Sequence, residues 1–357
     1  MRLVDLFCGT GGFSRGAERA GLEVALAVDV DPILTFSHTR NFPKTKLLLR
    51  DISSLAGSDL ETGAGGKIDG IFGGPPCQGF SSIGRRDPDD ARRRLLGEFF
   101  RLVREAEPKF FVMENVLGLL DRSARNELDE AITLLEDQYN VSEPYRVDAS
   151  EYGAATGRKR MFVVGTHKVT GVKVNLDDVE HWKKPAATVR QAISDLQHAD
   201  FAYDDVSGYD LWKVKSLGRP SGYFVGLRAD DGITTGHRET VHTPEVRKRF
   251  AKIAQGEIDK VGRHPRLEWS GQCPTLRAGT GADRGSYQSV RPIHPEEDRV
   301  ITAREGARLQ GFSDDHRFHP TTWHSFRMIG NSVAPFVAEA FFRAVASKMP
   351  PELLARS

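Results

Sequence analysis

The N-terminal stretch Leu3-Val-Asp-Leu-Phe-Cys-Gly-Thr-Gly-Gly-Phe-Ser14 predicts a buried strand, a glycine turn and the start of a helix. Its first residues form a short apolar run, and the segment from Arg15 to Ala20 is amphipathic. Glycines let a ligand approach the backbone, and the N-terminus of a helix favours anionic groups. The stretch is therefore typical of the first unit of a nucleotide-binding α/β sheet. A dehydrogenase would have the same pattern, and so would a turn that binds nothing.

A second apolar strand, Val24 to Val28, is followed directly by Asp29. Asp29 comes about 20 residues after the glycines, where nucleotide-binding folds usually place an acid on a ribose hydroxyl. This spacing makes Asp29 a candidate ligand residue.

The composition is that of a soluble globular protein with one large or two ordinary domains, because the 357 residues are 39% hydrophobic and 28% charged. The formal net charge of +1 neither indicates nor excludes a polyanionic partner. Three cysteines in so long a chain suggest a reducing compartment and no disulfide framework. We find no signal peptide, no apolar run long enough for a membrane span and no ligand-spaced Cys and His residues. A cytoplasmic protein without a metal site is expected.

The stretch Ile68-Asp-Gly-Ile-Phe-Gly-Gly-Pro-Pro-Cys-Gln-Gly-Phe-Ser81 combines an apolar strand with a loop that presents Cys77. Gly73-Gly-Pro-Pro76 ends the strand, because glycine permits unusual backbone angles and proline fixes its own and restricts the residue before it. A lone cysteine is most often a small apolar core residue. A cysteine at a loop mouth can instead be a nucleophile, provided that electropositive neighbours stabilise its thiolate.

Two later segments place charged side chains at strand ends. The apolar strand Lys109 to Met113 is followed by Glu114-Asn-Val116, and ligands bind at the carboxyl ends of strands in open α/β sheets. A carboxylate there could also simply cap the following helix. Tyr152-Gly-Ala-Ala-Thr-Gly-Arg-Lys-Arg160 then leads into the strand Arg160 to Val164.

In their order along the chain, these segments resemble the motifs of the C5-cytosine DNA methyltransferases. In that family the Pro-Cys dipeptide carries the nucleophile, and Glu-Asn-Val is the acid motif. The resemblance covers most of the chain except residues 170–290. The segments that carry it are Asp5 to Phe13, Ile68 to Ser81, Glu114 to Val116, Tyr152 to Arg160, Arg299 to Phe312 and Ile329 to Pro335.

The resemblance implies an α/β fold, a Rossmann-like S-adenosylmethionine-dependent methyltransferase sheet with a second, smaller target-recognition domain. We expect residues 1–168 to form the catalytic and cofactor-binding domain and residues 169–322 the target-recognition domain. Residues 323–357 are then a C-terminal segment that returns to the catalytic domain.

The resemblance also implies the catalytic residues Cys77, Glu114, Arg158 and Arg160. Cys77 would attack C6 of a flipped-out cytosine, and a protonated Glu114 would bind at N3. Arg160 would hold the base carbonyl, and Arg158 would support the loop or Glu114. Thr156 stands where the family usually has glutamine, which puts an amide contact there in doubt.

S-adenosylmethionine is the cofactor that the resemblance implies. Phe7 would lie against the adenine, Gly9 and Gly11 near the methionine part, and Asp29 at the ribose. Asp51 and Leu95 suit ordinary strand-end and helix positions nearly as well. The residues assigned to the cofactor are Phe7, Gly9, Gly11, Asp29, Val30, Asp51, Ile52, Pro75, Leu95, Asn331 and Ser332.

Double-stranded DNA is the expected partner, and a cognate restriction nuclease or another defence protein could be a further partner. We expect a monomer that does not associate with a membrane. The segment Ser82 to Leu95 contains five arginines and predicts a mobile loop that could close over phosphates. Arg247 to Lys252 could be a basic helix face on DNA. Solvated surface suits the first segment about equally well, and it is the commoner role of a charge run such as the second.

Three other functions are compatible with parts of the pattern. A tRNA-cytosine methyltransferase of the same family would use a similar active site. A catalytically inactive, sequence-specific DNA-binding protein would keep the fold, although the intact Cys77, Glu114, Arg158 and Arg160 argue against it. A nicotinamide-dependent oxidoreductase explains the glycine turn but not Pro-Pro-Cys-Gln.

Overall fold

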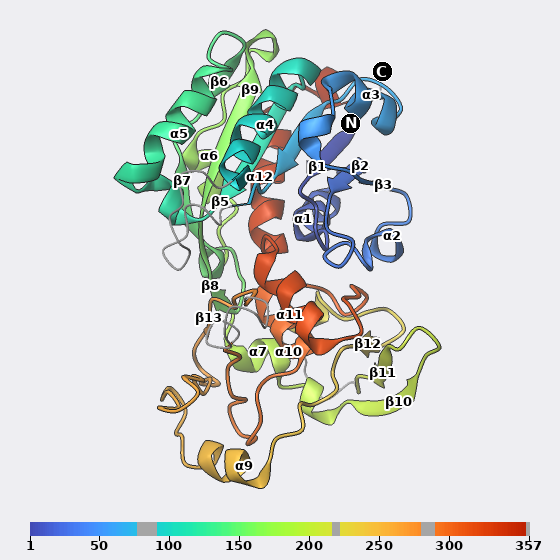
Figure 1. Ribbon diagram of the computed structural model, residues 1–357, viewed down its shortest axis with the longest axis vertical. Coiled ribbons are helices and arrows are strands. Elements are labelled where there is room, and N and C mark those ends of the chain that lie inside the picture. Colours follow the sequence, from blue (N-terminus) through green and yellow to red (C-terminus); the bar gives the residue numbers. More distant parts are fainter. Residues whose placement is uncertain (77–90, 216–221, 280–289, 355–357) are drawn as a thin grey trace. The chain divides into compact units, whose positions relative to one another are not determined.

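The strands of the N-terminal part of the chain form a mixed eight-stranded sheet (Figure 1). The structure is a computed structural model that describes residues 1–76, 91–215, 222–279 and 290–354. The strand order is β3-β2-β1-β4-β5-β9-β6, with β7 paired to β9. β1 to β5 are parallel, and β9 is antiparallel to β5, β6 and β7. The strands are β1 Leu3–Leu6, β2 Val24–Asp29, β3 Lys46–Leu49, β4 Gly70–Gly73, β5 Phe110–Asn115, β6 Tyr139–Val141, β7 Tyr145–Asp148 and β9 Lys159–His167.

One face of this sheet packs against α3 (Gly57–Ala64), α4 (Ala91–Ala106) and α5 (Arg122–Thr133). Every second side chain of the central strands points to this face, as the pleat of a strand requires. Residues of both layers form one buried apolar cluster, which includes Val4, Leu6, Ile71, Phe111, Met113, Phe99, Val103 and Leu128.

The other face packs against α1 (Gly12–Arg19) and α12 (Pro335–Lys348). The Phe72 ring of β4 lies 5.0 Å from that of Phe13 on α1 and 4.9 Å from that of Phe342 on α12, between centroids. A parallel sheet buried on both faces needs continuous apolar strands, which explains why β1, β4 and β5 are buried along their whole length.

The two helices of this second face are in close contact. A Cβ atom on Gly16 of α1 would lie 2.3 Å from Cβ of Ala338 on α12, so only glycine fits there. Arg19 of α1 also pairs with Glu339 of α12 at 2.7 Å. The last long helix of the chain therefore belongs to the same layer as the first.

These features confirm the predicted α/β fold, with two differences in the helices. α4 begins at Ala91, within the segment Ser82 to Leu95 that we expected to be a loop, because Arg and Leu are strong helix formers. Residues 82–90 of that segment lie outside the described residues. The sequence pattern from Arg122 to Gln138 predicts one helix, but α5 ends at Thr133 and residues 134–138 form turns.

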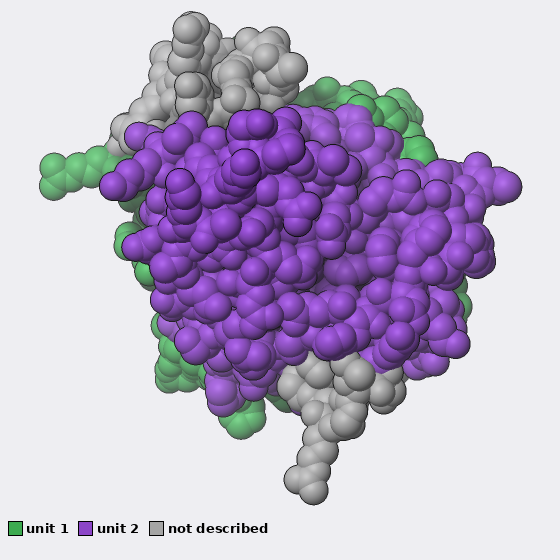
Figure 2. Space-filling model, turned by 90° about the horizontal axis from the view of Figure 1, so that it is seen from below, with its two compact units in different colours: residues 1–148, 159–183, 335–357 green, residues 149–158, 184–334 purple. Residues whose placement is uncertain are grey.

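The chain divides into two units, coloured in Figure 2. Unit 1 contains residues 1–148, 159–183 and 335–357, and unit 2 contains residues 149–158 and 184–334. The expected domains differ from these units in three segments. Residues 149–158 join unit 2 because β8 (Thr156–Gly157) pairs with β13 (Cys273–Pro274).

The other two differences have equally local causes. Residues 169–183 join unit 1, where Asp178 of α6 (Leu176–Glu180) pairs with Lys348 of α12 at 2.8 Å. Residues 323–334 join unit 2, where Gln310 donates hydrogen bonds to the carbonyls of Ile329 and Ser332 at 2.8 and 2.9 Å.

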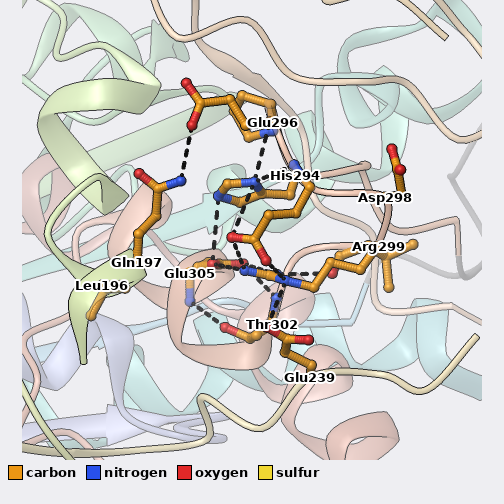
Figure 3. A network of polar contacts seen from close by, with 12 residues as sticks. Leu196, Gln197, Glu239, His294, Glu296, Asp298, Arg299, Thr302 and Glu305 are labelled. Carbon is orange, nitrogen blue, oxygen red and sulfur yellow. Dashed lines mark hydrogen bonds and ion pairs between the residues drawn. The ribbon is translucent and has the colours of Figure 1, made fainter. Parts of the chain in front are cut away.

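Unit 2 has short strands and a core that contains buried ion pairs (Figure 3). Both guanidinium ends of Arg299 contact the fully buried Glu305, at 2.8 and 2.9 Å. Burial alone would raise the pKa of Glu305, but the charge of Arg299 and its hydrogen bonds lower it to about 2. Arg308, also fully buried, pairs with Asp314 at 2.6 Å and Asp195 at 3.2 Å.

The remaining elements are short. In the parts of the chain that the structure describes, no helix is long and apolar enough to cross a membrane. These elements are α2 His38–Asn41, α7 Val189–Ile193, β10 Asp200–Asp204, β11 Asp210–Lys213, α8 Gly222–Val225, β12 Ile233–Thr235, α9 Pro244–Phe250, α10 Ala303–Gln310, α11 Thr322–Asn331 and α13 Pro351–Leu354.

Candidate active site

The glycine turn after β1 has the backbone that its sequence predicts. Gly9 and Gly11 have φ angles of 49° and 86°, and Phe7 between strand and turn has a φ of 63°. A Cβ atom on Gly11 would lie 2.2 Å from the ring of Phe42, whereas a Cβ atom on Gly9 would meet nothing within 4 Å. Gly11 is thus required by packing, and Gly9 leaves its surface open to a ligand.

Asp29, at the end of β2, is bound to this turn. Its carboxylate accepts hydrogen bonds from the backbone N–H of Gly9 at 2.8 Å, of Val30 at 2.7 Å and of Asp31 at 2.9 Å. Burial raises the pKa of Asp29, although the three backbone donors oppose that rise. Each carboxylate oxygen can accept more than one hydrogen bond, so Asp29 can still receive a ribose hydroxyl.

The other predicted cofactor residues of unit 1 differ in exposure. The side chain of Val30 is 67% exposed, so it is free to cover a flat apolar ligand. Asp51 is also exposed, and its Oδ1 accepts a hydrogen bond from the N–H of Ser53 at 2.9 Å. Ile52 belongs to the buried apolar cluster on one face of the sheet, and Leu95 packs against that cluster. A ligand could therefore contact Ile52 chiefly through its main chain.

Asp5 was not predicted as a site residue, although it lies directly below the glycine turn. It is 1% exposed, and its Oδ2 accepts a hydrogen bond from Ser14 Oγ at 2.5 Å. Its Oδ1 is buried and has no hydrogen-bond partner among the residues that the structure describes. Burial raises the pKa of Asp5 to about 8, and the charge of Asp29 adds to the rise. The sequence feature that could have identified Asp5 is an acidic residue inside an otherwise apolar strand.

The ends of β4 and β5 bring the second group of site residues together. Gly73 lies opposite Met113 in the parallel pair, so Gly74 and Pro75 follow beside Glu114 and Asn115. Cys77 and residues 82–90 of the segment Ser82 to Leu95 lie outside the described residues, which end at Pro76 and resume at Ala91. The structure therefore places the strand that leads to Cys77, two residues beyond Pro75, next to the acid motif.

Glu114 is paired with Arg160. The distance between Glu114 Oε1 and Arg160 Nε is 2.9 Å, and the Glu114 residue is 8% exposed. Arg160 lies on β9, which is antiparallel to β5, so neighbouring strands present the two charges. A nearby guanidinium favours the charged form of a carboxylate. The second oxygen, Oε2, would be 3.1 Å from a Cβ atom on Gly74.

Asn115 connects the two strand ends, and sequence reasoning gave it no role. Its Nδ2 donates a hydrogen bond to the carbonyl of Pro75 at 3.2 Å, and its Oδ1 accepts one from the N–H of Val116 at 2.8 Å. The residue is 2% exposed.

Arg158, Asn331 and Ser332 belong to unit 2. Arg158 is buried and donates hydrogen bonds to the carbonyls of Leu276 at 3.3 Å and Gly330 at 2.9 Å, so it holds the C-terminal end of α11, which carries Asn331 and is followed by Ser332. Thr156, at the position where glutamine was expected, donates from its hydroxyl to the carbonyl of Cys273 at 2.9 Å. It therefore joins β8 to β13.

Comparison with known proteins gives relatives that match nearly the whole chain. The Type II methyltransferase M.XorII of Xanthomonas oryzae pv. oryzae is 41% identical over 379 aligned positions, which cover 99% of this chain and 87% of the relative. The Type II methyltransferase M.DdeI of Desulfomicrobium norvegicum is 31% identical, and the alignment covers 97% of this chain and 88% of the relative.

Solved structures show the same fold. A crystal structure from an E. coli prophage, described as that of a DNA modification methyltransferase, has a TM-score of 0.84 and 36% identity. The match covers 98% of this chain and 99% of the prophage protein. The S. pombe Dnmt2 methyltransferase has a TM-score of 0.64 at 17% identity, over 97% of this chain and 98% of its own. Residues 1–347 match the C-5 cytosine-specific DNA methylases, and the chain belongs to this family of DNA (cytosine-5-)-methyltransferases.

Proposed function

We propose that this DNA (cytosine-5-)-methyltransferase acts on a flipped-out cytosine in a short specific sequence of duplex DNA, with Cys77 as nucleophile and Glu114 as acid. The observation that supports these roles best is the 2.9 Å pair of Glu114 and Arg160. It holds a carboxylate and a guanidinium beside the end of β4, from which the chain continues through Pro75 and Pro76 to Cys77.

The chemistry explains why a thiol and an acid are needed together. Cytosine C5 is a poor nucleophile, so covalent addition at C6 must first activate the ring. The Cys77 thiolate forms the S–C6 bond, the ring electrons move toward N3, and N3 takes a proton from Glu114. C5 can then form the bond to the methyl group, while the bond between this methyl group and the donor sulfur breaks and the sulfur keeps the electron pair. Loss of the C5 proton to a base, return of the N3 proton to Glu114 and departure of Cys77 restore the aromatic ring.

Glu114 must be protonated at the moment of attack, although its neighbour Arg160 favours the charged form. We infer that the carbonyl of the entering cytosine draws the Arg160 guanidinium away from Glu114. Glu114 then takes up a proton in a pocket from which the base excludes water, and it can donate that proton to N3. Arg158 has a supporting role in this proposal, since it holds the backbone of Leu276 and Gly330.

S-adenosylmethionine is the proposed methyl donor, and when bound it supplies an electrophilic methyl group. The turn fits such a ligand, because the surface at Gly9 is open, Val30 is exposed and Asp5 Oδ1 is a buried carboxyl oxygen without a hydrogen-bond partner among the described residues. In the proposal, Phe7, Val30, Asp51 and Ile52 hold the adenosine part, and Asp29 holds the ribose. The remaining residues proposed to contact the cofactor are Pro75, Leu95, Asn331 and Ser332.

The partners follow from the same proposal. A stacked base hides C5, so the target must leave the helix, at a cost of a few kcal/mol that protein contacts offset. The Type II methyltransferases among the relatives support a place in a restriction-modification system, beside a cognate nuclease or defence protein. A monomer and a cytoplasmic location stay predictions.

The test is base-resolution mapping of 5-methylcytosine in host DNA after expression of the wild type and of Cys77→Ala. We expect methylation at one short motif with the wild type and none with the variant. Cofactor binding by Cys77→Ala, measured by calorimetry, should remain. Methylation by the variant would contradict the role of Cys77, and loss of cofactor binding would make Cys77 a structural residue.

A further inference from the structure

The pairing of β4 with β5 cannot continue past Gly73 in the ordinary way. Pro75 and Pro76 have no backbone N–H, so they cannot donate to the neighbouring strand. At this point the side chain of Asn115 replaces the backbone, because its Nδ2 donates to the Pro75 carbonyl at 3.2 Å. The two strand ends are therefore still joined, by a side chain.

Asn115 itself is firmly held. Its Oδ1 accepts a hydrogen bond from the N–H of Val116 at 2.8 Å, and only 2% of the residue is exposed. Both ends of the amide are thus used, one on each strand. A buried amide with both ends satisfied has one orientation, so it can fix a distance between two backbone segments.

The space next to Glu114 shows how closely the two segments approach. A Cβ atom on Gly74 would lie 3.1 Å from Glu114 Oε2, so the backbone directly after β4 runs beside this oxygen. Because side chains alternate along a strand, Glu114 and Asn115 point to opposite faces of the sheet. Asn115 thus holds the strand end from one face, and Glu114 lies on the other face, where it pairs with Arg160.

We propose that Asn115 is a positioning residue for methyl transfer. By holding the Pro75 carbonyl it fixes the point from which the Cys77 loop leaves the sheet, relative to Glu114. The proposal rests on the roles of Cys77 and Glu114 given above. A misplacement of about 1 Å in such a site can cost about 100-fold in rate, so the loss of this one bond should be visible in the chemical step.

The variants Asn115→Asp and Asn115→Ala both remove the donated bond. Asn115→Asp keeps an acceptor for the N–H of Val116, so a loss shared by both variants is due to the contact with Pro75. Asn140→Asp is the matched control. Asn140 also donates its amide to a backbone carbonyl, that of Val172 at 3.4 Å, but from β6 of the same sheet.

The measurement is single-turnover methyl transfer to a duplex that contains the motif mapped for the wild type. We expect a rate about 100-fold lower for both Asn115 variants and an unchanged rate for Asn140→Asp. The dissociation constants of S-adenosylmethionine and of duplex DNA, and the melting temperature, should stay close to wild-type values. A trap with 5-fluorocytosine in the target position should show slower formation of the Cys77 adduct.

A rate within about threefold of wild type for either variant would overturn the proposal. So would a loss of cofactor binding and thermal stability in parallel with the rate, because that result describes a purely structural residue. An equal loss of rate in Asn140→Asp would also overturn the proposal, because the effect would then not be specific to Asn115. Methyl transfer by Cys77→Ala would instead overturn the proposed function, whatever the Asn115 variants do.

Discussion

Gly74 belongs to the proposed site because its lack of a side chain leaves space for Glu114. The position that its Cβ would take is 3.1 Å from Glu114 Oε2. A methyl group there would push the carboxylate away from Arg160 or shift the end of β4. Neither movement is compatible with the proposed contact of this carboxyl group with N3 of a cytosine.

We therefore expect Gly74→Ala to lower the single-turnover rate by about tenfold or more, because small displacements in a preorganised site are costly. Cofactor binding, measured by calorimetry, should remain. Gly97→Ala on α4 is the control, since a Cβ atom there meets nothing within 4 Å and alanine favours a helix. Equal activity of the two variants would show that the space beside Glu114 is not needed.

Asp5 gives a prediction for stability rather than rate. Its pKa in the folded protein is about 8, against 3.8 as its ordinary value. Between these two values the folded chain holds a proton that the unfolded chain has lost, so this residue lowers the free energy of unfolding as pH rises.

The variant Asp5→Asn cannot lose that proton, so it should gain relative to the wild type by about 1.4 kcal/mol per pH unit between pH 5 and pH 7. Urea denaturation of both proteins without cofactor, at pH 5, 6 and 7, measures the difference. Asp29 and Ser14 are the same in both proteins, so their contributions cancel. Parallel stability curves would show that Asp5 is charged in the fold.

Single residues also mark the limit of what the sequence could predict. Glu114 and Arg160 were predicted because each stands at an end of an apolar strand in a recognisable motif. The partner of Asn115 is Pro75, 40 positions away, and that of Asp5 is an oxygen on a helix. Such pairs depend on strand register and helix packing, which local patterns do not specify.

At the scale of elements, α10 shows how unit 2 uses charge in its core. Glu305 is the third residue of this helix, where its Oε2 accepts a hydrogen bond from the N–H of Thr302 at 2.7 Å. Arg299 contacts both of its oxygens. The first turn of α10 is thereby joined to the segment before it, which apolar side chains alone would not orient so specifically.

Removal of Arg299 should therefore be costly. Arg299→Met leaves Glu305 buried and charged, so we expect a loss of about 3–5 kcal/mol in the free energy of unfolding at pH 7. Arg125→Met is the control, since the pair of Arg125 with Asp129 is exposed and should contribute less than about 1 kcal/mol.

The pH dependence of this loss is a second check. The folded pKa of Glu305 is about 2, below its ordinary 4.5, so its stabilising effect is present above pH 4.5 and disappears as pH falls toward 2. Chemical denaturation at pH 3 and pH 7 should thus show a smaller difference between Arg299→Met and wild type at the lower pH. A constant difference would exclude the ion pair as its cause.

Elements were predicted better than their ends. The order of strands and glycine turns follows from apolar runs and from glycine and proline, so β1, β2, β4, β5 and β9 lie where expected. The start of α4 was not predicted, because a highly charged segment can form either a loop or an exposed helix face. Local composition does not decide between these states.

At the scale of the whole molecule, the chain enters and leaves unit 2 twice. We expected the target-recognition domain to begin at residue 169, but the changes of unit depend on contacts between distant segments. β8 joins unit 2 through β13, which follows more than a hundred residues later, and α6 stays in unit 1 through α12. Patterns along the chain cannot reveal such pairings.

The close contact of Gly16 with Ala338 has a consequence for synthesis on the ribosome. α12 covers the face of the sheet that holds Phe72 and Phe162, beside Phe13 of α1, and it is translated long after the last of the eight strands. Until then the nascent chain exposes this aromatic face, although all eight strands have already emerged. Completion of the eight-stranded sheet's packing therefore waits until α12 has been translated, and the growing polypeptide is a natural client for chaperones that shield apolar surfaces.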